Sequence, residues 1–337
     1  RNIIINGDMS IAQRGTSTSS VSTTQYPSLD RFQMYTQTAG SAVFTVSQDT
    51  DVPSGQGFAK SHKIDVTTAL GTYGASNFTI LRQRIEGQML GYLKKGTSNA
   101  ESLTLSFWVK SNKTGTYIAE IYDNDNSRQI SKSYTISSSN TWEKKTITFA
   151  GDTSGSLTLD NSVAIDLDFY LSAGSNYTSG TLNTSWNSVT TANRAVGQVN
   201  LADSTSNEWY VTGVQLEAGT SASDFEFLPF DVNLQRCQRY FELHRPNFFV
   251  ISRYSSSHSY GMFVSYKTEK RTTPTIARAD GAGTVDAHGA GESGYSSDAF
   301  ELNNTSVFAS AIKVSTGSSY TTWFCGCSSN LEIDSEL

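Results

Sequence analysis

A stretch about two thirds of the way along the chain, residues 208–243, changes its hydrophobic period halfway, and this change restricts the folds available to the whole sequence. Residues 208–217 read Glu-Trp-Tyr-Val-Thr-Gly-Val-Gln-Leu-Glu and alternate with a period of two, with apolar side chains on both faces. Such a strand is expected inside a β-sandwich and not at its rim. Strict alternation places Trp209 and Val214 on opposite faces of this strand.

The second half of the same stretch predicts a short amphipathic helix. Its apolar residues recur at spacings of four, three and four, which places them on one stripe of a helix. The stripe consists of Phe230, Leu234, Cys237 and Phe241. Asp231 is a suitable N-cap, and Pro246 limits the helix at its far end. An apolar stripe of this kind must be buried against another surface.

Composition indicates a β protein for the rest of the chain. Of the 337 residues, 37% are hydrophobic, 11% aromatic and only 17% charged. Such chains are typical of sandwiches with many short strands, whereas disordered chains are rich in charge and poor in aromatics. The formal net charge of −6 gives no field that would attract nucleic acid or an anionic membrane. Apolar runs fall far short of the ~20 residues that cross a bilayer, and no signal peptide opens the chain, so we expect a soluble protein without membrane insertion.

Several segments before residue 208 alternate as strands do. Apolar residues at every second position from 103 to 109 share one face, which places Trp108 on the opposite face. Residues 1–15 predict a strand with a polar turn, and the Ser/Thr run over residues 16–24 predicts a solvated loop. Residues 176–198 predict a second loop, whose length is unusual in a compact domain and favours a functional or interfacial role.

Two phrases of the sequence carry a resemblance to a known family. They read Trp209-Tyr-Val-Thr-Gly-Val-Gln-Leu-Glu-Ala-Gly219 and, after a spacer, Leu234-Gln-Arg-Cys-Gln-Arg-Tyr-Phe241. Agreement extends to the opening (Asn2 to Gly15, with Leu29-Asp-Arg-Phe32), to Lys270-Arg-Thr-Thr-Pro-Thr-Ile276 and to the ending Ile333-Asp-Ser-Glu-Leu337. Together they resemble a broad family of bacteriophage virion proteins, chiefly tail-fibre and receptor-binding proteins. The similarity spans nearly the whole chain and indicates the family without indicating a receptor.

The resemblance implies an all-β architecture. A jelly-roll β-sandwich similar to carbohydrate-binding modules is expected over residues 1–228, a linker helix over 229–245 and a smaller C-terminal β domain over 246–337. The resemblance also implies a homo-oligomer, most often a homotrimer, in which the helix and the C-terminal domain form subunit contacts. The candidate oligomer contacts are the stripe residues Phe230, Leu234, Cys237 and Phe241. The oligomer is expected on the virion as a tail or head fibre among other virion proteins. In that role the distal domain contacts glycans on the host surface, and several weak sites acting together hold a cell.

Jelly-roll modules of this kind bind glycans by stacking aromatic rings on the apolar faces of sugars. Candidate carbohydrate-binding residues are Trp186, Tyr177 and Tyr73 in loops of the N-terminal domain, Trp108 on the strand face opposite the core, and Tyr260, Tyr295 and Trp323 in the C-terminal domain. A tryptophan in an exposed loop, such as Trp186, usually covers or binds something. Core packing is the favoured interpretation for the three tryptophans in strands, Trp108, Trp142 and Trp209.

No metal or other cofactor is predicted. Asp123-Asn-Asp-Asn-Ser127 begins like a calcium loop, but the glycine and the twelfth-position glutamate are missing, so a hairpin turn is favoured. The related modules often hold calcium between the opening strand and an acid on the closing strand. Asp8 is present near the opening here, but Thr212-Gly213 stands where that acid is expected. The three cysteines lack the further ligands of a zinc site.

Catalysis is not predicted either. None of the four histidines stands in a recognisable nucleophile motif. Asp166 and Asp168 point the same way from one strand and could suit a glycosidase, but solvated strands supply such pairs constantly. We therefore predict a non-enzymatic, fibre-type virion protein that attaches to host glycans. The alternatives are a head-decoration fibre, a structural tail adaptor without a receptor, and a polysaccharide depolymerase, which would need an acid pair in a cleft.

Overall fold

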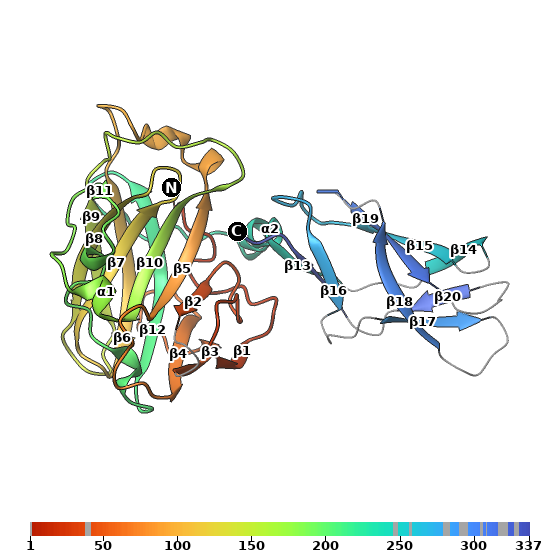
Figure 1. Ribbon diagram of the computed structural model, residues 1–337, viewed down its shortest axis with the longest axis horizontal. Coiled ribbons are helices and arrows are strands. Elements are labelled where there is room, and N and C mark those ends of the chain that lie inside the picture. Colours follow the sequence, from red (N-terminus) through yellow and green to blue (C-terminus); the bar gives the residue numbers. More distant parts are fainter. Residues whose placement is uncertain are drawn as a thin grey trace. The chain divides into compact units, whose positions relative to one another are not determined.

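The chain folds into two compact units, residues 1–233 with 337, and residues 234–336. The computed structural model describes residues 2–37, 42–244, 249–255, 258–278, 284–289, 296–303, 306–307, 309–315, 323–326 and 330–337. The larger unit is a two-sheet jelly-roll sandwich, and a short helix and a smaller β unit follow it (Figure 1). The predicted all-β fold class is confirmed.

Two antiparallel sheets form the sandwich, and in both of them strands distant in sequence lie side by side. Sheet A has the order β1 (Ser17–Val21), β3 (Val43–Asp49), β4 (Ser61–Thr68), β12 (Glu208–Ala218), β6 (Leu103–Ser111) and β9 (Glu143–Phe149). Sheet B has the order β11 (Asn187–Ser188), β8 (Arg128–Ile136), β7 (Gly115–Asp123), β10 (Val163–Ala173), β5 (Phe78–Glu86) and β2 (Gln33–Gln37). The predicted hairpin turn over residues 123–127 is confirmed, since it joins β7 to β8.

Short helices complete the larger unit at its loops. They are α1 (Ser175–Thr178) and the 3-10 turns η1 (Gly87–Met89), η2 (Gly91–Leu93), η3 (Thr191–Asn193) and η4 (Leu201–Asp203). The segment predicted as a long loop contains helix α1, the 3-10 turn η3 and the short strand β11. That segment is therefore held in a defined conformation over sheet B.

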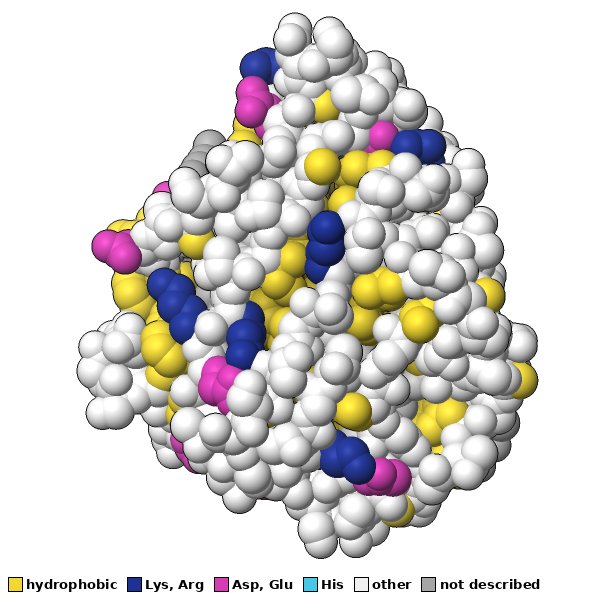
Figure 2. All heavy atoms as spheres, turned by 90° about the vertical axis from the view of Figure 1, so that its left-hand side faces the viewer, with side chains coloured by type: hydrophobic (Ala, Val, Ile, Leu, Met, Phe, Trp, Pro, Cys, Tyr) yellow, Lys and Arg dark blue, Asp and Glu magenta, His cyan; other side chains and the backbone are white. Residues whose placement is uncertain are grey.

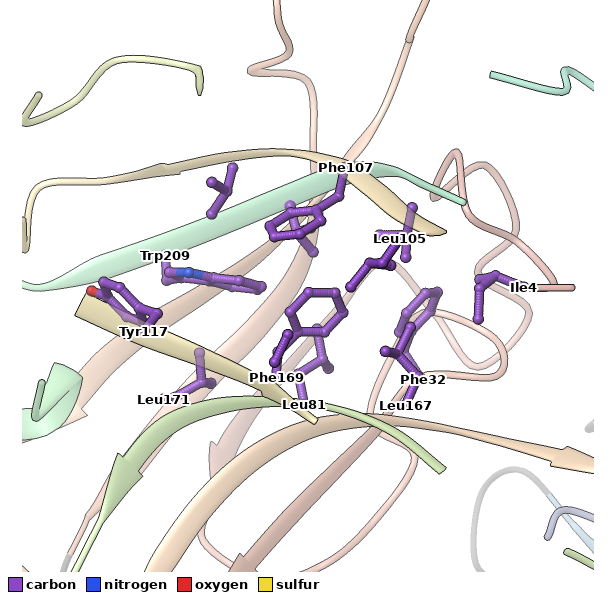
Figure 3. Packing of buried hydrophobic residues seen from close by; sticks show 14 of the residues in the cluster. Ile4, Phe32, Leu81, Leu105, Phe107, Tyr117, Leu167, Phe169, Leu171 and Trp209 are labelled. Atoms are coloured by element: carbon purple, nitrogen blue, oxygen red, sulfur yellow. The ribbon is translucent and has the colours of Figure 1, made fainter. Parts of the chain in front are cut away.

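The core fills the space between the sheets with the inward side chains of both. Leu105 and Phe107 of β6 meet Leu167 and Phe169 of β10, and Trp209 of β12 lies among them (Figure 3). The rings of Phe107 and Phe169 pack edge to face at 5.0 Å between their centroids. Trp209 is fully buried, which confirms the core role predicted for it.

Strict alternation along β12 is wrong at one point. The register shifts between Thr212 and Gln215, where Gly213 adopts a φ of 63°. This β-bulge adds one residue, so that Val214 returns to the core face that Trp209 occupies. Glycine tolerates the left-handed backbone because it has no Cβ.

The opening segment is buried but does not form a strand, which corrects the prediction for residues 1–15. Its backbone turns sharply, with a φ of 61° at both Asn6 and Met9. The amide of Ile3 donates to the carbonyl oxygen of Leu216 at 2.8 Å, and the amide of Val214 donates to Gly7 at 2.9 Å. The segment therefore lies along the closing strand. The neighbouring Ser/Thr run, predicted as a loop, instead supplies the edge strand β1.

The helix α2 (Phe230–Gln238) exists, but the predicted stripe is wrong in part. Phe241 lies in the next strand, and Phe230 is 63% exposed. Cys237 is buried, as is Asn233 one turn earlier, so the buried stripe runs through these two residues. Asp231 stands in the first turn, because the helix begins one residue before it.

The smaller unit contains two sheets. The first has the order β13 (Phe241–His244), β21 (Leu331–Asp334) and β16 (Thr275–Arg278). The second closes on itself and consists of β14 (Phe249–Ser255), β15 (His258–Ser265), β19 (Ala309–Ser315), β18 (Ser296–Asn303), β17 (Thr284–Gly289) and β20 (Trp323–Gly326). No helix in the described part of the chain is long and apolar enough to cross a membrane.

Candidate functional site

The outer face of sheet A carries a pocket of about 300 Å³, which we call the sheet A pocket. It is lined by Gly55, Gln56, Phe58, Ser106, Trp108, Lys144, Gly213, Asp224, Phe225 and Phe227. Four aromatic residues are among them, and so are an amide, a hydroxyl, an ammonium and a carboxylate. Aromatic side chains beside groups that can form hydrogen bonds are a common feature of small-molecule sites.

The pocket is built on the β-bulge of the closing strand. A Cβ at Gly213 would lie 2.5 Å from the ring of Phe58, so this ring rests on bare backbone. Phe58 packs against Phe225 and against Phe227, with 5.1 Å between ring centroids in each case. Phe58 is buried, whereas Phe227 is 50% exposed. The three phenylalanines thus form a fixed apolar wall with one open side.

Trp108 and Lys144 stand opposite each other on β6 and β9. The alternation of β6 turns Leu105 and Phe107 into the core, so the half-buried Trp108 faces outward beside the pocket. Lys144 is exposed. The expectation of core packing is therefore wrong for Trp108, although the alternation in the sequence already contained the signal for its outward position.

Next to the pocket, on the same face of sheet A, charged side chains of the protein pair with one another and lie against aromatic rings. The ammonium of Lys110 lies 4.1 Å from the ring centroid of Tyr210 and 5.7 Å from that of Trp142. Lys110 also pairs with Asp51, which accepts a 2.8 Å hydrogen bond from the indole N–H of Trp142. Burial raises the pKa of Tyr210 to about 12. Trp142 is half-buried on this outer face, so core packing is wrong for it as well.

The outer face of sheet B carries a row of buried charges. Asp168 stands opposite Arg82 on one side and Glu120 on the other. Arg82 binds Asp168 through two hydrogen bonds of 2.7 Å and lies 3.3 Å from Asp166. Burial raises the pKa of Asp166 to about 6. The ring of Tyr35 lies 4.1 Å from the guanidinium of Arg82 and covers it.

The segment 174–200 closes this row from outside. Its Arg194 donates to both carboxylate oxygens of Glu120, at 3.0 and 2.6 Å, and its guanidinium lies 4.8 Å from the ring of Tyr122. Glu120 is fully buried, and burial raises its pKa despite the nearby Arg194. Apolar residues of the segment, Tyr177 among them, complete a second hydrophobic cluster on the same face. The outer face of sheet B is therefore filled by the protein itself.

The predicted sugar-binding residues in the loops of the larger unit make contacts within the protein and do not line the sheet A pocket. Tyr73 is 8% exposed, and its hydroxyl bonds to Thr79 at 2.8 Å in the core. Tyr177 packs edge to face on Phe78, at 5.2 Å between centroids. Trp186 is half-buried, and its indole N–H donates to the carbonyl oxygen of Ala150 at 2.7 Å. None of these three lines the sheet A pocket.

Three further predicted sugar-binding residues belong to the smaller unit. Tyr260 lies in β15 and Trp323 lies in β20. Their side chains, and the whole of Tyr295, lie outside the described residues. Their role in glycan binding stays a prediction.

The acidic residues that resemble a calcium site are engaged by other groups. The ammonium of Lys95 pairs with Asp123, and it lies 3.0 Å from Asp152 and 2.8 Å from the carbonyl oxygen of Gly155. Asp8, near the opening, accepts a 3.0 Å hydrogen bond from the side-chain amide of Asn233. Within the described residues, no cluster of three or more His, Cys, Asp or Glu side chains is placed to hold a metal ion.

Comparisons with known proteins return structures but no family. No family model matches the sequence, and no curated protein matches it either. The enzymatically active domain of tailspike protein 4 of bacteriophage CBA120 matches 64% of this chain and 21% of its own, with 16% identity and a TM-score of 0.33. A CBM4 module matches 63% of this chain and 97% of its own, with 14% identity and a TM-score of 0.32. A family 11 carbohydrate-binding module from Clostridium thermocellum matches 61% of this chain and 98% of its own, with 12% identity and a TM-score of 0.31. Similarity at this level assigns no ligand or activity.

Proposed function

We propose that the chain is a fibre-type structural protein of a bacteriophage virion that attaches to glycans on the host surface. The sequence resemblance supports the virion role. The sheet A pocket is the observation that carries glycan binding, because it offers an open aromatic wall with separate polar groups. Sugars present an apolar ring face and a polar rim, and this arrangement matches both.

The size of the pocket and the sparse charge of the surface are compatible with a glycan ligand. A volume of about 300 Å³ lies at the small end of the range for ligand sites, which suits the end of a glycan chain. Figure 2 shows one face of the protein, on which a few acidic and basic side chains are dispersed among uncharged surface, several of them with an acidic and a basic group side by side. That face therefore presents no broad charged field of the kind that recruits nucleic acid.

We further propose that the protein has no hydrolytic activity. A glycosidase places its two carboxylates on either side of a bound sugar, roughly 5–9.5 Å apart, with access to substrate. Asp166 and Asp168 instead share Arg82 in a buried row, with exposed side-chain fractions of 1% and 0%. Arg194 of the segment 174–200 also lies 3.8 Å from Asp168, so this carboxylate is further enclosed by the protein's own cations.

Self-association is part of the proposal, and its surface differs from the predicted stripe. Phe227, Phe230 and Val232 are 50%, 63% and 40% exposed, and they lie within six residues of one another. Large apolar side chains that stay exposed favour contact with another protein surface. The same exposed residues favour the second candidate function, a structural adaptor or head-decoration fibre that binds neighbours in the virion and no receptor.

Cell labelling and binding to a glycan array test these candidates together. The full chain is purified, its mass is measured by light scattering, and it is applied to host cells and to the array. Trp108→Ala is expected to abolish binding to both, because it removes part of the pocket wall. Tyr92→Ala is the matched control, since Tyr92 is 49% exposed and lies outside the pocket.

Each result separates the candidates. Saturable labelling that Trp108→Ala removes and Tyr92→Ala keeps would support attachment through the sheet A pocket. An oligomer that binds neither cells nor glycans would favour the adaptor or decoration role. Binding that survives Trp108→Ala would remove the pocket from the proposal and direct attention to Trp186 or to the smaller unit.

A further inference from the structure

We infer that the sheet A pocket selects an acidic sugar, whose carboxylate pairs with Lys144 while its ring lies against Trp108. This inference rests on the proposed glycan-binding function and names the class of its ligand. Three features of the outer face of sheet A carry it: the pairing of its lysines, the cover of its aromatic rings, and the placement of Asp224.

The first feature is the pairing of the lysines. In the row next to the pocket, Lys110 pairs with Asp51, and Lys63 lies 2.8 Å from Glu208. Lys144 forms no ion pair with any residue that the structure describes. The neighbouring lysines, Lys63 and Lys110, are therefore paired with acidic residues of the protein. Lys144, which lines the pocket, has no such pair among the described residues, so its ammonium group can pair with an acidic group of a ligand.

The second feature is the cover of the aromatic rings. Lys110 lies within 4.1 Å of the ring centroid of Tyr210 and also contacts Trp142. No cation of the described residues lies over the ring of Trp108, which leaves that ring open to a ligand. Trp108 and Lys144 are direct cross-strand partners, and such Cβ atoms lie about 5 Å apart. A sugar on Trp108 therefore has its ring substituents within reach of the Lys144 ammonium.

The third feature orients the ligand. Asp224 lines the pocket, and within the described residues its carboxylate pairs neither with Lys144 nor with another cation. The backbone around it is fixed, because the side-chain amide of Gln215 donates to the Asp224 carbonyl oxygen at 3.2 Å and accepts from the Glu226 amide at 2.8 Å. A carboxylate in this place accepts hydrogen bonds from sugar hydroxyls and repels the acidic group of the sugar, so that group is directed towards Lys144.

The expected selectivity follows from the charge on the ligand. A hydrogen bond between two charged groups contributes more than one between neutral groups, and the difference amounts to about a tenfold gain in affinity for the acidic sugar. Salt screens exposed charges, so this preference shrinks as ionic strength rises. Contacts of the ring with Trp108 are shared by acidic and neutral sugars and are insensitive to salt.

Matched oligosaccharides test the inference with the full chain. The probes are two pairs of oligosaccharides. One pair ends in glucuronate or in glucose, and the other ends in galacturonate or in galactose. Their dissociation constants are measured by calorimetry at low and at high salt. We expect at least one acidic probe to bind about tenfold more tightly than its neutral partner. Lys144→Gln is expected to remove that preference, so that the acidic and the neutral probe of each pair bind with similar affinities. Lys94→Gln is the control for charge, because Lys94 is 53% exposed and lies outside the pocket.

The outcomes distinguish this inference from the function on which it rests. Equal binding of acidic and neutral probes, with Trp108→Ala abolishing both, would overturn the acidic-sugar inference and leave glycan binding in place. A preference for acidic probes that persists in Lys144→Gln would overturn the role of Lys144. Binding of no probe by the wild-type protein, together with no signal on the glycan array, would overturn the proposed function itself.

Discussion

His62 should make the stability of the larger unit fall as the pH falls below neutrality. This histidine of β4 is fully buried, and neither ring nitrogen has a hydrogen-bond partner among the described residues. Its ring packs edge to face on Phe32, at 5.9 Å between centroids. Burial lowers the pKa of His62 to about 3, because a charged imidazolium would lose its hydration without gaining a partner.

The sign and the size of the effect follow from that pKa. The unfolded chain takes up a proton near a pH of about 6.5, whereas the folded protein does not until far lower pH. Folding stability from this group is therefore complete above pH ~6.5 and is lost progressively as the pH falls towards ~3. For these two pKa values, the loss between about pH 7.5 and about pH 5 amounts to about 2 kcal/mol.

The test compares wild type with His62→Phe, which keeps an aromatic ring beside Phe32 and cannot be protonated. Urea unfolding followed by tryptophan fluorescence gives the free energy of unfolding at several pH values. Other groups also titrate, and the raised pKa of Asp166 stabilises the fold as the pH falls, so the difference between the two proteins is the informative quantity. We expect that difference to shift by about 2 kcal/mol in favour of the variant by about pH 5.

Parallel pH profiles for the two proteins would refute the argument, because they would show that His62 is solvated or paired in the folded state. His62→Gln provides a second variant without a titrating group, in case the larger phenyl ring prevents folding. Its profile should follow that of His62→Phe in slope, whatever its absolute stability.

Three further substitutions test other parts of the sandwich. Lys95→Met should lower the free energy of unfolding by about 3–5 kcal/mol, since it leaves the buried Asp123 without its cation, whereas Asp152 keeps its pair with Arg128. A loss below about 1 kcal/mol in urea unfolding would contradict the pairing. Gly213→Ala should lower the free energy of unfolding by about 1–3 kcal/mol and weaken glycan binding, because the new Cβ would meet the Phe58 ring at a left-handed backbone position. An unchanged melting curve would argue against the bulge. Arg194→Ala leaves Glu120 buried without its cation, so hydrogen exchange should accelerate in the segment 174–200 while β10 stays protected, and unchanged exchange there would show that the ion pair does not hold the segment.

The pattern of the sequence was enough to place the core of the sandwich. Alternation between residues 103 and 109 correctly sets Phe107 inside and Trp108 outside, because side chains in a strand must point to opposite faces. Composition and alternation together predict the all-β class for the same reason, since a weakly charged, aromatic-rich chain buries its apolar residues between sheets. The same pattern did not reveal that Trp108 lines a pocket, because this depends on segments far away in the sequence.

Tertiary structure alone decided the features that no local pattern records. The bulge at Gly213 reverses the faces of the closing strand, and the helix ends before Phe241 because that residue pairs in a new strand. The sheet A pocket needs Phe58 and Phe227, 169 positions apart in the numbering, to meet over that bulge. Arg194 closes the charged row of sheet B from a segment that the sequence predicts only as a long loop. Sequence thus determines which side chains prefer to be buried, through local periodicity, whereas pairing across the chain decides which polar and aromatic groups stay exposed to bind a partner.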